Sequence, residues 1–308
     1  MKYSFVVIAY NEEHNIQRCL DSILVQEGLG SSYEIVVVDD CSADKTPQKV
    51  KRMQSKNKKI KLIRNKQNGG RGYSRHAGVS AVSGDYIAMI DGDIILPAEW
   101  LKTCMEQIQD YDAVSGVPVP DGDVAFIFNT FGLKPKVVAT SAPITGSNGL
   151  YRSGIFKNLN FDPALRNGED IEFNHQLEAA GYRTCPIVSL VVEHNEKISF
   201  RQSMLWLYQS GIGATAQLKK YRIVRLPDLA FSGFIAVAAI SVIIYVSFNV
   251  KVYALFLPAL LYLLASSAMH IHSKFQFTKK PLLSTVAILV NLNLLMAYYA
   301  GRLVGIIT

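Results

Sequence analysis

The sequence predicts an α/β domain built on a parallel sheet, followed by an all-α region. Between residues 2 and 90, short apolar runs alternate with stretches of helical periodicity, as is typical of strands joined by helical crossovers. From about Leu229 onward the apolar stretches lengthen, and no acidic residue follows Asp228. We therefore predict a first domain at residues 1–199, a connector at 200–228 and a helical region at 229–308.

The strands of the first domain are predicted from runs rich in Val and Ile. The run at residues 2–9 is nearly continuous, which suits a strand buried on both faces of a sheet. Further strands are predicted at residues 33–39, 60–64, 86–90 and 187–192. Strands of this kind need a layer of helices on each face.

Helices are predicted in the segments between these runs. Residues 14–26 place apolar side chains at helical spacing, and these form one stripe that would pack against a sheet. Further helices are predicted at residues 45–55, at 71–83, from Pro97, and after Glu169 and Asp170 as far as Ala180. The alternation implies parallel crossovers and an α/β sandwich.

Three apolar stretches of the C-terminal region predict transmembrane helices. Residues 229–248, 252–271 and 282–301 each have the length of about 20 residues that crosses a bilayer core. The alternative is buried helices of a soluble domain, which would normally show charged faces every turn. Asn291 and Asn293 interrupt the third stretch, and their amides could hydrogen-bond another helix.

Basic residues flank these stretches and predict a multi-pass membrane protein whose first domain faces the cytosol. Four precede the first stretch and three separate the second from the third: Lys219, Lys220, Arg222, Arg225, Lys274, Lys279 and Lys280. The net charge of +7 favours membrane lipid and phosphate-bearing substrates as partners. The connector would lie at the membrane interface or pack on the first domain.

Other partners and site types fit the composition poorly. No basic stripe interleaved with aromatic residues occurs, so nucleic acid is not expected as a partner. The four cysteines form no Cys-x-x-Cys pair, which argues against a zinc site or a disulfide framework. The chain begins with a strand-like run, so we expect no cleaved signal peptide. A homo-oligomer is compatible with the sequence.

Polar residues follow the predicted strands at the edge where ligands of parallel sheets bind. Tyr10, Asn11 and Glu12 follow the first strand, Asp39 and Asp40 the second, and Asp91, Gly92 and Asp93 the fourth. Two carboxylates this close repel each other unless a cation neutralises them, and hard divalent ions prefer oxygen ligands. The acidic pair therefore predicts a Mg²⁺ or Mn²⁺ diphosphate site, although Asp and Gly also form ordinary turns.

Several blocks of sequence resemble, in order and spacing, the signature blocks of family 2 glycosyltransferases. They are YSFVVIAYNEE, EIVVVDDCSADKT, NGGRGYSRHAG, GDYIAMIDGD, GSNGLYR, FDPALRNGEDIEF and LEAAGYR. The resemblance implies a GT-A, Rossmann-like, nucleotide-sugar-binding domain, a nucleotide-sugar donor and inversion at the anomeric carbon. With the helical region, the predicted fold class is a GT-A α/β domain followed by an all-α transmembrane region.

The resemblance also implies roles for single residues. The donor site would contain Tyr10, Glu12 and Asp40 at the base and ribose, Arg75 at the nucleotide or diphosphate, Asp91 at ribose or metal, and Gly146, Ser147 and Asn148 at the sugar or acceptor. Asp93 would bind the metal directly, and His194 occupies a place where some members use a histidine as a further ligand. Ser74 and His76 depart from the usual Ala-Arg-Asn pattern around Arg75.

Inverting transfer needs a base that deprotonates the acceptor as it attacks. By resemblance, Asp170 is this base and Glu169 shapes the acceptor loop, although acids at a helix start also complement the helix dipole. Small turn residues at 146–148 could simply permit a tight loop, and a lone histidine or a helix cap would equally explain His194 or Asp40.

The predicted function is sugar transfer from a nucleotide donor to a polyprenyl phosphate or lipid-linked glycan. Transfer to a cell-surface polysaccharide and a non-catalytic nucleotide-binding membrane scaffold are the alternatives. A dinucleotide-dependent oxidoreductase fits poorly, because its glycine fingerprint should directly follow the first strand. Here that strand leads into Tyr10, Asn11 and Glu12 instead.

Overall fold

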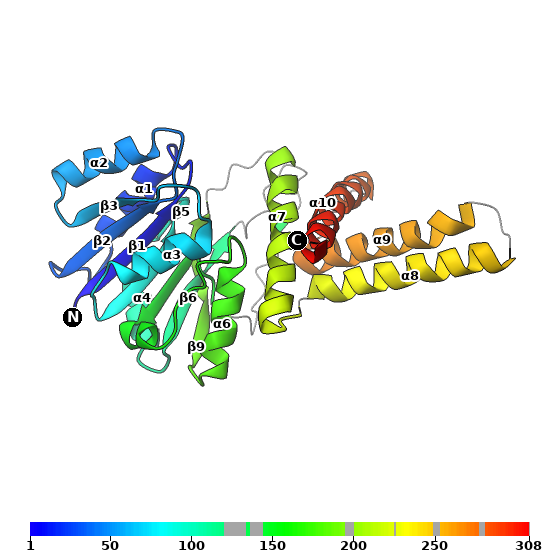
Figure 1. The fold of residues 1–308 in the computed structure, drawn as a ribbon. Helices are drawn as coiled ribbons and strands as arrows, with labels where there is room; N and C mark the ends of the chain where they lie inside the picture. The colour runs from blue at the N-terminus through cyan, green and yellow to red at the C-terminus, as the bar shows by residue number, and fades with distance from the viewer. Residues whose placement is uncertain are drawn as a thin grey trace. The chain divides into compact units, whose positions relative to one another are not determined.

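The computed structural model describes residues 1–119, 134–135, 144–194, 200–224, 226–248, 253–276 and 281–307. The chain forms two compact units (Figure 1). The sheet unit comprises Met1–Gly122 and Val137–Glu196, and the helical unit comprises Asp123–Lys136 and Lys197–Thr308.

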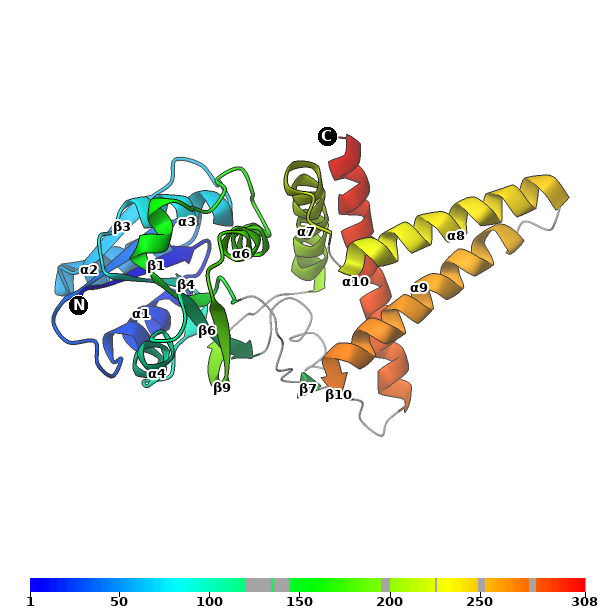
Figure 2. The ribbon, with the colours of Figure 1, turned by 90° about the horizontal axis from the view of Figure 1, so that it is seen from below.

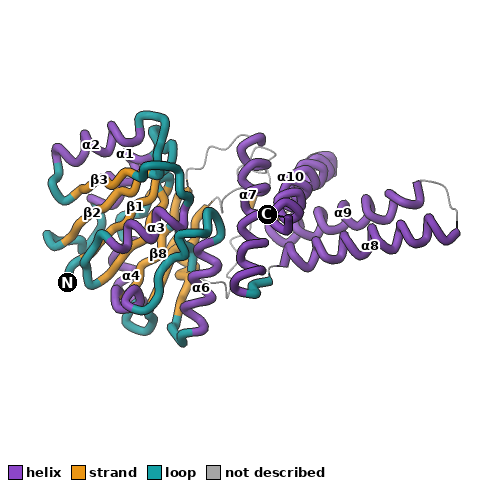
Figure 3. Tube along the Cα trace, in the orientation of Figure 1, coloured by secondary structure: helices purple, strands orange, loops and turns teal. Residues whose placement is uncertain are grey.

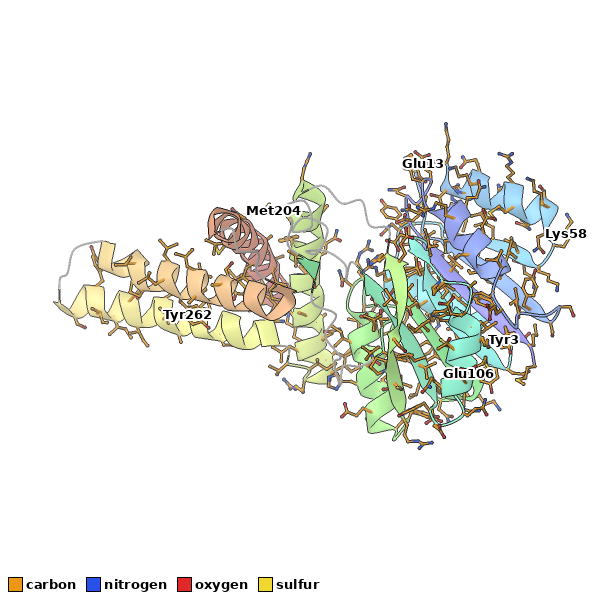
Figure 4. The ribbon with its side chains drawn as sticks, turned by 180° about the vertical axis from the view of Figure 1, so that it is seen from behind. Tyr3, Glu13, Lys58, Glu106, Met204 and Tyr262 are labelled. Carbon is orange, nitrogen blue, oxygen red and sulfur yellow. The ribbon has the colours of Figure 1, made fainter. Side chains whose placement is uncertain are left out.

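An eight-stranded mixed sheet forms the centre of the sheet unit (Figure 3). In the order in which they lie side by side, its strands are β3 (Ile60–Arg64), β2 (Tyr33–Asp39), β1 (Tyr3–Ala9), β4 (Tyr86–Asp91), β8 (Asn148–Arg152), β6 (Ala113–Val119), β9 (Thr184–His194) and β5 (Ile94–Ile95). The first four strands are parallel, which confirms the predicted crossovers. In Figure 4, Tyr3 at the start of β1 and Glu13 beyond its end lie at opposite edges of this unit.

Helices cover both faces of the sheet (Figures 1 and 2). Core contacts place α1 (Ile16–Leu24), α2 (Thr46–Lys56) and α4 (Trp100–Gln107) on one face, and α3 (Arg71–Ser80), η2 (Ser153–Lys157) and α6 (Glu169–Ala179) on the other. The side chains of β1 alternate between these two layers, since Phe5 and Val7 belong to the first core and Val6 and Ile8 to the second. A strand covered on both faces needs the apolar run that predicted it.

The sheet differs from the predicted one in its second half. Strand β8 runs antiparallel to β4, and β6 is antiparallel to β8. Neither strand was predicted, because Gly149 and Asn148 in β8 and Pro118 in β6 are residues that occur mostly in turns and at sheet edges. The chain therefore returns through the middle of the sheet and carries the loop before β8 to the end of β4.

Glu34 is a buried carboxylate at the amino ends of the parallel strands, which is the side of the sheet away from Asp91 and Asp93. Glu34, near the start of β2, accepts hydrogen bonds from Ser4 Oγ at 2.9 Å and Ser83 N at 3.1 Å, and pairs with Lys2 Nζ at 2.7 Å. Burial alone would raise the pKa of Glu34, but the bonds from Lys2, Ser83 and Ser4 lower it to about 2. The charged form therefore stabilises the fold.

We expect Glu34→Gln to destabilise the sheet unit by about 2–3 kcal/mol at pH 7. Because the folded pKa lies below the unfolded one, this stability is present above about pH 4.5 and is lost as the pH falls toward 2. Urea unfolding followed by Trp100 fluorescence, in a Trp206→Phe background, measures the difference. If the difference in the free energy of unfolding between wild type and Glu34→Gln stayed constant from pH 7 to pH 2, the charged carboxylate would not be the source of this stability.

The helical unit contains α7 (Phe200–Tyr221), α8 (Leu226–Phe248), α9 (Tyr253–Lys274) and α10 (Pro281–Ile307), with a short pairing of β7 (Lys134–Pro135) and β10 (Phe275–Gln276). Glycines let α7 and α10 approach closely. A Cβ added at Gly301 would come within 1.9 Å of Tyr208 O, and one at Gly211 within 2.2 Å of Tyr298 O. Gly233 of α8 packs in the same way on Tyr262 of α9, labelled in Figure 4.

The predicted membrane spans are not supported. Within the described parts of the chain, none of the helices combines the length and the apolar character that crossing a bilayer requires. This finding contradicts the predicted localisation as a multi-pass membrane protein. Part of the apolar surface that suggested lipid contact is buried inside the helical unit, where Leu263, Tyr298 and Tyr299 form a core with Ala214. The buried Arg302 donates to Thr215 Oγ1 at 3.2 Å.

Candidate active site

The acidic turn lies at the carboxyl end of β4, in the middle of the sheet. Asp91 N donates to Ser147 O at 2.9 Å, and Gly92 N donates to Ile8 O at 2.9 Å. A Cβ added at Gly92 would meet Ile8 O at 3.1 Å and Glu12 Cγ at 3.3 Å, so the turn packs directly on the end of β1. The turn is therefore fixed between β1 and the loop that precedes β8.

Asp93 and His194 lie together because β5, which follows the turn, pairs with the end of β9. Asp93 Oδ2 and His194 Nε2 are 3.1 Å apart. Burial alone would raise the pKa of Asp93, but the hydrogen bond and charge of His194 and the charge of Arg71 lower it overall. Two of the three predicted metal ligands thus meet across the sheet.

A divalent cation fits this pair only in part. Within the described residues no group of three or more His, Cys, Asp or Glu side chains is arranged to hold a metal. Asp91 Oδ1 is 2.8 Å from Arg75 Nη2 and is thus bound to a cation of the protein itself. A Mg²⁺ or Mn²⁺ ion with only Asp93 and His194 as side-chain ligands would need the remaining positions filled by water and substrate phosphates, as hard cations often arrange.

Glu12 and Tyr10 follow β1, and Glu12 packs against the acidic turn. Glu12 Oε2 accepts from Asn15 Nδ2 at 2.8 Å. Burial, together with the charges of Asp93 and Asp91, raises the pKa of Glu12 to about 8. Tyr10 is 50% exposed and presents its ring to solvent. Their roles at the donor base and ribose stay predictions.

Asp40 holds a loop together. It is 5% exposed, and its carboxylate accepts from Gly69 N and Gly70 N at 2.8 Å each and from Asn65 Nδ2 at 2.7 Å. Gly70 has a φ of 87°, which favours glycine, and an added Cβ would strike Arg166 Cα at 2.6 Å. Asp40 therefore fixes the start of α3 whether or not it also contacts a nucleotide.

Arg75 lies on α3 and is 1% exposed. Its guanidinium donates to Glu169 Oε1 at 2.9 Å, to Gly146 O at 2.6 Å and to Asp91 Oδ1 at 2.8 Å. Burial alone would lower the pKa of Arg75, but Asp91 and Glu169 raise it, so the side chain is charged. The structure thus places Arg75 among protein acceptors, whereas the resemblance implied that it faces the donor.

The two adjacent acids at the start of α6 differ in environment. Gly168 adopts a left-handed conformation with a φ of 81° and begins the helix. Glu169 is 1% exposed and paired with Arg75, whereas Asp170 is partly exposed. Burial raises the pKa of Glu169, against the opposing effect of Arg75. Only Asp170 is thus accessible enough to serve as a general base.

Gly146 and Asn148 lie beside these acids in different ways. An added Cβ at Gly146 would meet Asp170 Cβ at 2.9 Å and Arg75 Cζ at 3.3 Å. Asn148 is fully buried in β8, where its Oδ1 accepts from Gly116 N at 2.7 Å. The structure therefore places Asn148 inside the sheet and Gly146 against the candidate base.

Sequence analysis did not single out Arg71, the first residue of α3. Burial alone would lower the pKa of Arg71, but the charges of Asp91 and Glu169 raise it. Arg71 thus adds a second positive charge beside the acids. Its place in the glycine-rich block NGGRG, four residues before Arg75, is the only signal that would have marked it.

Comparison with known proteins identifies the sheet unit. It has the GT-A-like, nucleotide-sugar-binding α/β fold. A solved structure of the mannosyltransferase PcManGT from Pyrobaculum calidifontis, in complex with GDP-Man and Mn²⁺, matches with a TM-score of 0.62 at 20% identity, covering 98% of this chain and 87% of that one. Residues 4–151 match the family described as Glycosyl transferase family 2. This part of the chain therefore resembles a glycosyltransferase family 2 domain, as the sequence blocks predicted.

Two relatives illustrate the range of the family. The succinoglycan biosynthesis protein ExoO of Rhizobium meliloti is 35% identical over 191 residues, covering 54% of this chain and 53% of ExoO. A dolichyl N-acetyl-α-D-glucosaminyl phosphate 3-β-D-2,3-diacetamido-2,3-dideoxy-β-D-glucuronosyltransferase of Methanococcus voltae is 22% identical over 241 residues, or 70% of this chain and 74% of that protein. The chain thus spans about half the length of ExoO.

Proposed function

We propose that this protein is an inverting, metal-dependent glycosyltransferase that moves a sugar from a nucleoside diphosphate to a hydroxyl of a glycan acceptor. The observation that carries the proposal is the chain of contacts from Asp91 through Arg75 to Glu169, with Asp170 packed beside Gly146. Asp91 at the end of β4 and Asp170 at the start of α6 are thereby linked through Arg75 and Gly146. The family 2 domain supports the same reaction class.

Asp170 is the proposed general base. It takes the proton of the acceptor hydroxyl as that oxygen bonds to the anomeric carbon of the donor sugar. The bond from that carbon to the diphosphate breaks on the opposite side, and the nucleoside diphosphate leaves with the electron pair. Glu169 stays paired with Arg75 and keeps the start of α6 in place.

Asp93 and His194 are the proposed metal ligands, and Asp91 is the proposed contact for the ribose or the metal. A bound Mn²⁺ or Mg²⁺ would neutralise charge on the leaving diphosphate. The name of the Pyrobaculum structure gives Mn²⁺ and GDP-Man as its ligands, which supports a cation and a nucleotide sugar here. Tyr10, Glu12 and Asp40 are the proposed contacts for the base and ribose of the donor nucleotide.

A lipid-linked glycan is the first acceptor to test. The name of the Methanococcus relative specifies a dolichyl-phosphate-linked sugar as its acceptor, whereas ExoO is named for the biosynthesis of the polysaccharide succinoglycan. Both acceptor classes offer a sugar hydroxyl, so the chemistry proposed for Asp170 is the same for either.

The purified full-length protein tests the proposal directly. It is incubated with Mn²⁺ and a panel of UDP- and GDP-sugars, with polyprenyl-phosphate-linked sugars or oligosaccharides as acceptors. We expect nucleoside diphosphate release that needs Mn²⁺ and an acceptor, with a product of inverted anomeric configuration. Donor binding without turnover across the panel would favour the non-catalytic scaffold instead.

A further inference from the structure

We infer that Arg75 is a positioning residue that fixes the base-bearing helix relative to the acidic turn, and that it does not bind the donor itself. The inference rests on the proposed function, because it concerns the geometry of Asp170. It replaces the donor contact that sequence resemblance implied for Arg75. Its evidence comes from contacts within the sheet unit.

The guanidinium of Arg75 joins three segments that are distant in sequence. Its Nε binds Glu169 at the start of α6, its Nη1 binds the carbonyl of Gly146 before β8, and its Nη2 binds Asp91 at the end of β4. A planar guanidinium presents its donors in a fixed fork, so three such bonds also fix the directions of the segments. With 1% exposure, little of Arg75 can reach a ligand in solvent.

Close packing of the same segments also restricts the position of Asp170. Because an added Cβ at Gly146 would come within 2.9 Å of Asp170 Cβ, the loop before β8 lies directly against the first turn of α6. The same Cβ would lie 3.3 Å from Arg75 Cζ. A shift of the guanidinium must therefore move the loop, the helix start, or both.

The surroundings of Arg75 also make its orientation rigid. One face of the guanidinium lies 5.8 Å from the centre of the Phe161 ring. Phe161 stacks on Phe173 of α6 with ring centres 4.2 Å apart. Lysine in place of Arg75 would keep the positive charge and lose both the fork and the flat contact with the ring. The geometry of the site therefore depends on arginine, and charge alone does not replace it.

The experiment compares Arg75→Lys with wild type and with Arg152→Lys as a matched control. Arg152, on β8 of the same unit, donates to Ile108 O at 2.7 Å and Tyr111 O at 3.3 Å and contacts none of the site acids. Three quantities are measured on the full-length proteins: the Kd of UDP or GDP with Mn²⁺, kcat for transfer, and hydrogen exchange of residues 144–147 and 168–175.

We expect Arg75→Lys to keep the nucleotide Kd within about threefold and to lose about 100-fold in kcat, since a small misplacement of a catalytic group can cost this much. Exchange of both segments should accelerate, whereas Arg152→Lys should leave kcat and these segments unchanged. A loss of nucleotide affinity as large as the loss of kcat would overturn the inference and make Arg75 a donor ligand. Unchanged kcat would overturn it as well.

A second pair of variants covers the case in which Arg75→Lys does not fold. Glu169→Gln keeps an oxygen that can accept from Arg75, whereas Glu169→Leu does not, so we expect the Gln variant to retain at least about tenfold more activity. Equal activities would contradict the inference. If wild type itself transfers no sugar, the proposed function fails, while the exchange measurement still tests the role of Arg75.

Discussion

Asp170→Asn is expected to bind the donor as wild type does and to lose at least about 100-fold in kcat for sugar transfer. The substitution keeps the size of the side chain and its place beside Gly146, so the site should remain assembled. An amide cannot take the proton of the acceptor hydroxyl. Nucleotide affinity is measured by calorimetry and transfer by product analysis in the same preparation.

Glu178→Gln is the matched control, because Glu178 is an exposed acid on the same helix. It removes one carboxylate from α6 without touching the site, so transfer should not change. Wild-type turnover by Asp170→Asn would remove Asp170 from the mechanism. Loss of donor binding in Asp170→Asn would instead indicate a role on the donor side.

Asp93→Ala is expected to lose at least about 100-fold in Mn²⁺-dependent nucleotide affinity. Loss of a residue that only supports a metal ligand already costs about 10–100-fold, and Asp93 is proposed as a direct ligand. The change also leaves the partly buried His194 without the carboxylate at 3.1 Å. Calorimetry of UDP or GDP, with and without Mn²⁺, separates metal-dependent binding from the rest.

Asp110→Ala supplies the control for this second prediction, since Asp110 is an exposed acid in the same unit that lies just beyond α4. Nucleotide binding by that variant should keep its full dependence on Mn²⁺. If Asp93→Ala kept the same dependence, the cation would have to bind elsewhere, and the proposed pair with His194 would be wrong.

The first half of the fold could be predicted because its strands are buried on both faces. Such strands, β1 for example, need an apolar side chain at nearly every position, and this leaves a continuous signal in the sequence. Strands β6 and β8 lack this signal. Their place between β4 and β9 depends on pairings with partners distant in sequence, which local patterns do not record.

In the candidate site, too, some features could be predicted from local sequence and others depend on residues distant in the chain. The positions of Asp91 and Asp93 at the end of a strand, and of Asp170 at the start of a helix, could be predicted from local pattern and family resemblance. The burial of Glu169 and its ion pair with Arg75 could not, because the two residues are 94 positions apart in the chain. Tertiary packing decides which of two adjacent acids is accessible.

The C-terminal region was misread for a related reason. An apolar stretch of about 20 residues fits a bilayer and also fits a helix that packs on other helices. Tyr298 and Tyr299 lie in the third predicted span, and both are buried in the core of the helical unit. Hydropathy alone does not distinguish these two environments.

The most direct test of the account is a crystal structure of the full-length protein with Mn²⁺ and the donor sugar nucleotide that the panel identifies. We expect Mn²⁺ between Asp93, His194 and the diphosphate, with the Asp170 carboxylate on the opposite face of the anomeric carbon. A structure in which Asp93 and Asp170 open onto separate surfaces, with no shared sugar between them, would contradict it.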